Sequence, residues 1–266
     1  MPHRNPQRRS HPQQPLPPGI IVIGPYRCAT SFLSHVLSGK GVDFGPPHEL
    51  YAADQWNPYG YFQRPDVLRA NNDFIASAGH SVFSPADPDT LRERGDIGHL
   101  HLASLDWRYR SALWGIKDPR FCATAMCWYA AGLFGKHAGL IRIRREPLDS
   151  ARSLLQHPEL AAQLDEATLE SALQVILRYD RLADQQLRQF PGLMLSLDFE
   201  DLIRETSAGK TGRCIIAIDR FIGRLTASAA SADPLTAGCR KAPGIIRDRG
   251  RAGLFHVPAR SGFSSK

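Results

Sequence analysis

A short run of β-branched residues, Ile20-Ile21-Val22-Ile23, ends at Gly24 and is followed by a segment with helical spacing. A continuous apolar run of this length is typical of a parallel strand that is covered on both faces. Apolar residues then recur at residues 30–37 with the spacing of a helix, which Gly39 and Gly41 end. The sequence therefore predicts a buried strand that a tight turn joins to a helix.

Strand and helix signals alternate along the rest of the chain. Further strands are predicted at residues 113–116, 140–143 and 193–197, and further helices at residues 120–131, 148–155, 167–190 and around 214–222. This alternation indicates an α/β fold, a P-loop NTPase-like sandwich whose central, mostly parallel sheet is flanked by helices. Residues 20–226 are assigned to this one domain, since a chain of 266 residues suits a single domain of generous size.

The two ends of the chain differ from this domain in composition. Residues 1–19 contain six Pro and three Arg and are predicted to form a disordered basic arm, and residues 227–266 a basic, weakly ordered tail. Of the net charge of +7, residues 1–19 carry +3 and residues 240–266 carry +6, which leaves −2 for residues 20–239. The total charge therefore does not make the domain a binder of nucleic acid or membrane surfaces.

Other features exclude further classes. No apolar run reaches the roughly 18–20 residues that span a bilayer, and the N-terminal segment lacks the apolar centre of a signal peptide. The five Cys form no CxxC pair, so neither a zinc ribbon nor a disulfide framework is indicated. Reduced thiols in a cytoplasmic protein are the simpler interpretation. The sequence contains no cluster with metal-ligand spacing, and no metal is predicted.

The turn at residues 24–31 leads from the first predicted strand into the N-terminus of a helix. Free backbone N–H groups and the helix dipole make such a turn a site for an anion. Thr30 and Ser31 add hydroxyl donors and Arg27 adds a positive charge, so a phosphate or sulfate group is predicted to bind there. The P-loop of nucleotide triphosphatases has a Lys where this chain has Thr30, which argues against a P-loop kinase and against hydrolysis of ATP or GTP.

A second strand–turn–helix segment contains Arg145, Pro147 and Ser153. Pro147 suits the first turn of the helix, and Arg145 stands at the carboxyl end of the strand, where ligands bind in sheets of this kind. An Arg can offer an anion two parallel hydrogen bonds. Arg145 and Ser153 are therefore candidates for a second anion site, with a basic surface turn that binds nothing as the alternative.

Both segments resemble the nucleotide-binding motifs of sulfotransferases. The stretch GPYRCATSFL is similar to the family's 5′-phosphosulfate loop, with departures at Cys28 and Ala29, where the family has Ser or Thr and Gly. The second segment matches the 3′-phosphate motif, R-x-P-x-x-x-x-x-S. Residues 57–63, 114–120 and 195–202 resemble a bacterial branch of these enzymes, except that Gln63 replaces the usual Glu. The resemblance covers about residues 20–223.

The resemblance implies an enzyme that moves a sulfuryl group from 3′-phosphoadenosine 5′-phosphosulfate (PAPS) to a hydroxyl or amine of a small molecule or glycan. It implies no metal and no specific nucleic-acid partner, and it leaves the oligomeric state open. The residues it assigns to the 5′-phosphosulfate are Arg27, Cys28, Ala29, Thr30, Ser31 and Phe32. It assigns Arg145 and Ser153 to the 3′-phosphate.

The same resemblance suggests catalytic roles. Arg27 is assigned to the leaving phosphate and the transferring sulfonate, and Lys117 is a second candidate for that charge. A structural ion pair with Asp118 is the alternative for Lys117, and Arg120 is predicted to be a surface charge. Some sulfotransferases use Glu as the base and others His, so Glu49 is the first candidate for the base.

His48 is the alternate base, and a solvated loop charge is the alternative interpretation of both residues. Gln63 cannot act as a base. Two other functions stay open. One is a catalytically degenerate relative that binds the nucleotide without turnover, which Cys28, Ala29 and Gln63 motivate. The other is a basic protein that binds polyanions through the two ends of the chain.

Overall fold

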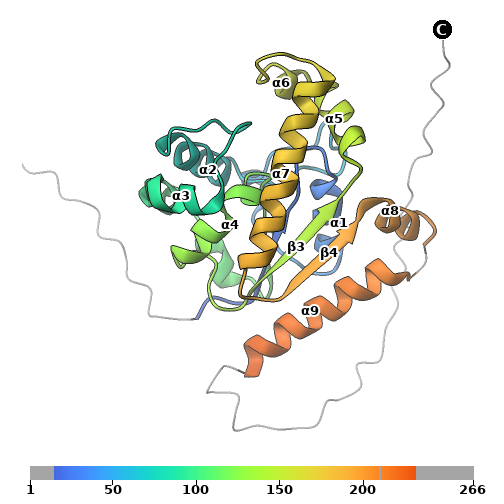
Figure 1. Cartoon of the computed structure of the whole chain (residues 1–266). Helices are drawn as coiled ribbons and strands as arrows, with labels where there is room; N and C mark the ends of the chain where they lie inside the picture. Colours follow the sequence, from blue (N-terminus) through green and yellow to red (C-terminus); the bar gives the residue numbers. More distant parts are fainter. Residues whose placement is uncertain (1–14, 210, 232–266) are drawn as a thin grey trace, which may run out of the picture.

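The computed structural model describes residues 15–209 and 211–231. Its centre is a four-stranded sheet with the strand order β2-β1-β3-β4 (Figure 1). The strands are β1 (Gly19–Ile23), β2 (Trp114–Lys117), β3 (Ala138–Arg144) and β4 (Met194–Asp198). Each neighbouring pair in this sheet is parallel. The predicted α/β class with a parallel sheet is therefore confirmed.

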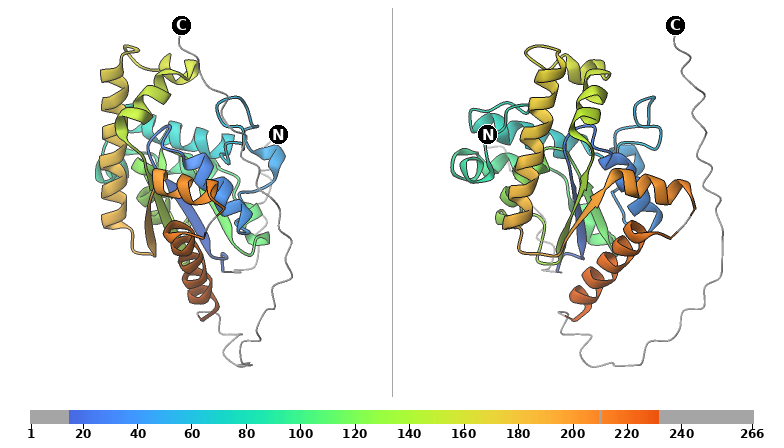
Figure 2. Two further views of the ribbon diagram at one scale, coloured as in Figure 1. Left: turned by 90° about the vertical axis from the view of Figure 1, so that its right-hand side faces the viewer. Right: turned by 45° about the vertical axis from the view of Figure 1, so that its right-hand side comes forward.

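Helices cover both faces of the sheet, as the two views of Figure 2 show. The α-helices are α1 (Thr30–Gly39), α2 (Pro65–Ser77), α3 (Pro88–Arg94), α4 (Phe121–Ala130), α5 (Pro147–Leu155), α6 (Pro158–Ala161), α7 (Leu169–Gln189), α8 (Phe199–Ser207) and α9 (Arg213–Ser231). Short 3-10 helices span Pro47–Glu49, Ile97–Leu102 and Asp106–Arg110. Helices α2, α3, α4, α5 and α7 share one apolar core, and α1, α8 and α9 share the other.

Strand β1 belongs to both cores. Ile21 and Ile23 pack on the α4 and α7 side, whereas Ile20 and Val22 pack on the α1 and α9 side. All four side chains are fully buried. Successive residues of a strand point to opposite faces, so the unbroken apolar run that predicted this strand is what a sheet covered on both sides requires.

The topology decides where a ligand can bind. The chain passes from β1 to β2 on one side of β1 and then places β3 on the other side. Because the strands are parallel, their carboxyl ends meet at one edge, and the change of direction opens a crevice beyond the ends of β1 and β3. The 24–31 turn follows β1, and Arg145 follows β3. Both predicted anion sites therefore lie at this crevice.

Two boundaries differ from the predicted ones. Ordered contacts begin before residue 20, since the Trp114 indole Nε1 donates to the Pro17 carbonyl at 2.7 Å and Leu16 lies against Gly135. Helix α9 continues to Ser231, past the predicted domain end at residue 226. The rest of the predicted arm and tail, residues 1–14 and 232–266, lies outside the described residues. Within the described part of the chain, no helix has both the length and the apolar composition needed to cross a membrane.

Candidate functional site

The 24–31 turn presents the N-terminus of α1 to the crevice. Ala29 occupies the N-cap position of α1, and no side chain caps the first backbone N–H groups of the helix. Arg27 and Ala29 have φ angles of 59° and 67°, in the left-handed region. The departure from Gly at position 29 thus falls where the backbone favours Gly. Uncapped N–H groups and the helix dipole make this turn a candidate site for an oxyanion.

Cys28 turns its side chain away from the crevice. Its thiol donates to the Ile143 carbonyl of β3 at 2.9 Å and is buried. Burial raises the pKa of this thiol to about 12, so it stays protonated at neutral pH. Cys28 therefore ties the turn to β3 and offers a ligand its backbone alone. Gly24 is required by the same packing, because a Cβ there would lie 2.9 Å from the Ile143 carbonyl oxygen.

The two predicted anion motifs contact each other across the crevice. Arg27 Nε donates to Ser153 Oγ at 3.0 Å, although the two residues are 126 positions apart. Arg145 Nη1 donates to the backbone carbonyl of Arg27 at 3.0 Å. The Arg145 guanidinium also lies over the Phe199 ring at 5.2 Å, and Phe32 packs edge-on against that ring. The structure therefore brings the predicted residues together, with the Arg145 guanidinium against the backbone of Arg27.

The segment at residues 54–61 contacts Arg27 and the first turn of α1. Arg27 Nη2 donates to the Trp56 carbonyl at 3.4 Å, and Ser31 Oγ donates to the Tyr61 carbonyl at 3.5 Å. The Tyr61 hydroxyl donates to Asp54 Oδ2 at 2.7 Å, which closes the segment on itself. The stretch that resembled the bacterial branch thus forms a wall of the site.

His157 belongs to the site although the sequence did not predict it. Its ring lies 5.1 Å from the Trp56 ring, and its Nδ1 is buried and makes no hydrogen bond to the described residues. Burial lowers the pKa of His157, and the nearby charge of Arg27 lowers it further, so the ring is neutral at pH 7. His157 follows the end of α5 and is the N-cap residue of α6, so no helical spacing in the sequence linked it to Ser153.

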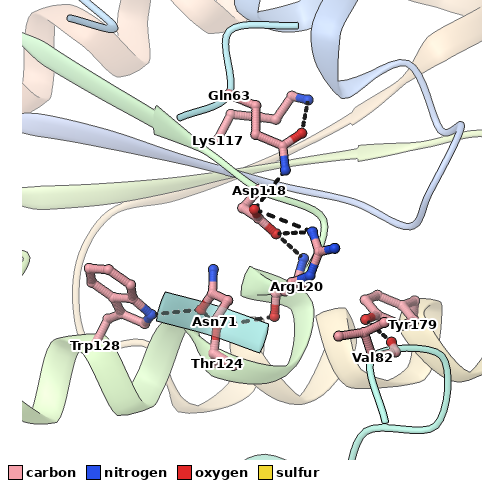
Figure 3. A network of polar contacts seen from close by, with 9 residues as sticks. All are labelled: Gln63, Asn71, Val82, Lys117, Asp118, Arg120, Thr124, Trp128 and Tyr179. Carbon is pink, nitrogen blue, oxygen red and sulfur yellow. Dashed lines mark hydrogen bonds and ion pairs between the residues drawn. The ribbon is translucent and has the colours of Figure 1, made fainter. Parts of the chain in front are cut away.

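The other side of the crevice holds the buried polar network, which consists of Gln63, Lys117, Asp118 and Arg120 (Figure 3). Asp118 is fully buried and accepts from Gln63 Nε2 at 2.7 Å and from the Arg120 backbone N–H at 2.7 Å. It also forms an ion pair with Arg120 Nη1 at 3.2 Å. The prediction that Arg120 is a surface charge is wrong, because it is buried against Asp118 and the Tyr26 ring.

Lys117 stands at the end of β2 in this network. Its Nζ donates to Gln63 Oε1 at 3.4 Å and lies 6.0 Å from the centre of the Tyr61 ring. Burial lowers the pKa of Lys117 to about 8, against the opposing effect of Asp118. The ion-pair partner of Asp118 is Arg120 instead of Lys117. Lys117 is thus a buried ammonium group without a carboxylate partner in the described residues.

The two candidate bases lie on an element of their own, outside the 24–31 turn and the buried polar network. Glu49 and His48 belong to the 3-10 helix Pro47–Glu49, and the His48 side chain is 82% exposed. Glu49 Oε2 forms an ion pair with Arg64 Nη2 at 2.7 Å. In the described part of the chain, neither side chain is bonded to Arg27, Lys117 or Ser153. The contacts of Glu49 are with Arg64 instead of the predicted anion sites, and the role of Glu49 or His48 as the base stays a prediction.

No group of three or more His, Cys, Asp or Glu side chains among the described residues is arranged to hold a metal ion. The donors at the crevice are guanidinium, ammonium, hydroxyl and backbone N–H groups. This donor set suits oxyanions.

The solved structures that resemble this chain include two sulfotransferase domains. A sulfotransferase domain from the curacin biosynthetic pathway is 15% identical, with a TM-score of 0.44 over 73% of this chain and 71% of that one. A sulfotransferase domain from the Synechococcus PCC 7002 olefin synthase is 16% identical, with a TM-score of 0.43 over 80% of this chain and 75% of that one. No family model and no curated protein matches the sequence. Likenesses of this size leave the activity to be argued from the site itself.

Proposed function

We propose that the chain is a sulfotransferase that moves a sulfuryl group from PAPS to a hydroxyl or amine of a small-molecule or glycan acceptor. The observation that carries the proposal is the contact of Arg27 with Ser153 and of Arg145 with the Arg27 carbonyl. PAPS carries a phosphosulfate and a separate phosphate on one nucleotide. A site that binds both needs two adjacent oxyanion sites, which the 24–31 turn and the Arg145–Ser153 pair supply.

In this proposal one group of residues stabilises the charge that develops during transfer, and a second group holds the nucleotide. The S–O bond to the leaving 5′-phosphate breaks while sulfur bonds to the acceptor oxygen or nitrogen, so negative charge grows on the leaving phosphate. Arg27, the N–H groups of α1 and Lys117 stabilise that charge. Positioned donors of this kind are the main source of rate in related group transfers. Arg145 and Ser153 hold the 3′-phosphate and so fix the nucleotide.

The acceptor also has to lose a proton to a base. Glu49 is engaged with Arg64, and His48 is exposed to solvent. His157 fits the role better, because its ring is neutral at pH 7 and its buried Nδ1 has no hydrogen-bond partner in the described residues. Its position beside Trp56 and near Arg27 places it at the crevice. In this proposal His157 takes the acceptor proton.

The test is calorimetric binding of the product nucleotide, adenosine 3′,5′-bisphosphate. The wild-type chain should bind it in the micromolar range. Arg145→Gln should weaken binding by about 10–100-fold, as expected for loss of hydrogen bonds to a charged group. Arg152→Gln is the matched control, since Arg152 lies on α5, the helix that follows Arg145, is exposed and contacts Asp149 instead of the crevice. No binding by the wild type, or an equal loss in both variants, would overturn the proposal.

One observation favours the second candidate function, a relative that binds the nucleotide without turnover. Gln63 stands where the resembling enzymes have Glu, and its amide is bonded to both Asp118 and Lys117. Nucleotide binding without sulfuryl transfer to a broad panel of alcohols, phenols, amines and sugars would favour this candidate. The polyanion-binding alternative depends on the two ends of the chain, most of which lies outside the described residues, so it stays a prediction. A cytoplasmic location stays a prediction.

A further inference from the structure

A groove of about 490 Å³ lies between α3 and α7, apart from the crevice. Its walls include Arg94 of α3 and Arg178, Arg181 and Gln185 of α7. None of these residues belongs to the 24–31 turn, the Arg145–Ser153 pair or the buried polar network. The volume falls in the range of about 300–1,000 Å³ that is usual for small-molecule sites.

The spacing in the sequence gives the groove its basic character. Arg178, Arg181 and Gln185 follow one another at three and four residues, so they share one face of α7. The acidic residues of the same stretch, Asp180 and Asp184, instead pair with Arg142 of β3. Helix α7 therefore separates its charges, with acids toward the sheet and arginines toward the groove.

Helix α3 supplies the facing wall with the same spacing. Asp87, Thr90 and Arg94 again lie three and four residues apart and line the groove. The Asp87 carboxylate is occupied, since it caps α3 by accepting from the N–H groups of Asp89 and Thr90 and from the Thr90 hydroxyl. The groove thus contains three guanidinium groups against one carboxylate that is already hydrogen-bonded.

The arginines of the groove have no acidic partners of their own. Arg178 Nη1 donates to Ser84 Oγ at 2.8 Å and to the Pro85 carbonyl at 3.2 Å, both uncharged acceptors. Over the described residues, no carboxylate lies within ion-pair distance of Arg94, Arg178 or Arg181. The neighbouring Arg92, by contrast, pairs with Asp89. Three guanidinium groups that face one cavity, with none of them paired to its single carboxylate, favour an anionic ligand.

A second observation concerns the uncharged part of the ligand. Gln185 Oε1 is buried and accepts no hydrogen bond from the described residues. A buried acceptor without a donor is costly, and a ligand hydroxyl would supply that donor. We propose that this groove binds a phosphate monoester of a sugar or similar polyol, with the ester phosphate on the three arginines and a hydroxyl on Gln185.

The test is calorimetry at low salt with glucose 6-phosphate, inorganic phosphate and glucose as probes. Glucose 6-phosphate should bind more tightly than inorganic phosphate, and glucose alone should not bind. The double variant Arg94→Gln/Arg181→Gln should weaken glucose 6-phosphate binding by about tenfold or more. Both side chains are exposed, so the variant should keep the fold, which a thermal melt checks.

Two matched variants separate the groove from other basic surfaces. Arg188→Gln removes an exposed charge from α7 outside the groove, and Arg145→Gln weakens the crevice. Both should leave glucose 6-phosphate binding unchanged. The proposal is overturned if no binding is seen at about 10 mM, if the double variant binds normally, or if either control loses as much as the double variant. Equal affinity for inorganic phosphate would overturn the role of Gln185.

Discussion

The 24–31 turn and the buried polar network lie at the same edge of the sheet, yet they hold their charges in different ways. The turn uses neighbouring residues of one segment and a helix N-terminus, and Arg27 is half-buried at its surface. The network draws on a loop before α2, the end of β2 and the start of α4, and Lys117, Asp118 and Arg120 are all buried. Arg27 in the turn is partly exposed and can meet a ligand directly, whereas in the network Asp118 and Arg120 pair with each other and Lys117 has no carboxylate partner among the described residues.

The largest expected difference between the two regions is the loss of stability when Asp118 is removed. Asp118→Ala removes the carboxylate that accepts from Gln63 and Arg120, which leaves a buried guanidinium unpaired. Removing one partner of a buried pair costs about 3–5 kcal/mol, so the free energy of unfolding should fall by that amount. Denaturant titration measures it.

Asp149→Ala is the control for Asp118→Ala. Asp149 is an exposed acid in the first turn of α5 and pairs loosely with Arg152 at 3.5 Å. Its loss should cost under about 1 kcal/mol. If the two variants cost the same, the network is not held together by Asp118.

The protonation of Lys117 sharpens the same comparison. Burial lowers the pKa of Lys117 from 10.5 to about 8. Between these two pH values the unfolded chain binds a proton that the folded chain has released, so this group makes stability rise with pH. The rise amounts to at most about 3 kcal/mol. This rise of stability with pH should be absent in Lys117→Met.

Measuring both proteins from about pH 7 to about pH 10 isolates this contribution. Burial raises the pKa of Tyr26 and Tyr179, which lowers stability at high pH in the wild type and in the variant alike. The stability of the wild type relative to Lys117→Met should therefore increase with pH. Parallel curves would mean that Lys117 is as well solvated as a surface lysine.

The sequence predicted the parts of the fold that depend on periodicity. Strand β1, helix α1 and the long helix α7 appear within a few residues of the predicted ranges, because alternation and helical spacing reflect which faces are buried. The stretch from residue 43 to residue 106 was not predicted. Its seven-residue α3 and short 3-10 helices are too short for a periodic pattern to emerge. The 13-residue α2 is not, since Val67, Ala70 and Phe74 are buried at helical spacing, and this pattern was missed.

The site divides in the same way as the two regions compared above. The sequence alone predicted that Arg27, Arg145 and Ser153 lie at one edge of the sheet, because parallel strands fix where their following turns lie. Arg120 could not be placed, because its burial depends on Tyr26 and Asp118 from other elements. The sequence showed no ion-pair partner for Glu49 either, because Arg64 lies 15 positions further along the chain. Partners of buried or paired charges are set by tertiary contacts that a linear motif does not contain.

The smallest expected effect concerns the turn itself. Ala29 has a φ angle of 67°, and the left-handed region costs a residue with a Cβ about 1–2 kcal/mol. Ala29→Gly removes this strain but also loses a half-buried methyl group and adds chain entropy. The free energy of unfolding should rise by about 0.5–1 kcal/mol, as measured by denaturant titration.

Ala217→Gly in the second turn of α9 is the control, and it should lower stability by about 0.5–1 kcal/mol because the backbone there is helical. Opposite signs in the two variants would show that the turn holds its shape against the preference of its own residue. Contacts outside the turn, such as the Cys28 bond to Ile143 and the Arg145 bond to the Arg27 carbonyl, then maintain that shape. If Ala29→Gly is instead destabilising, the Ala29 methyl group contributes more through packing than the backbone strain costs.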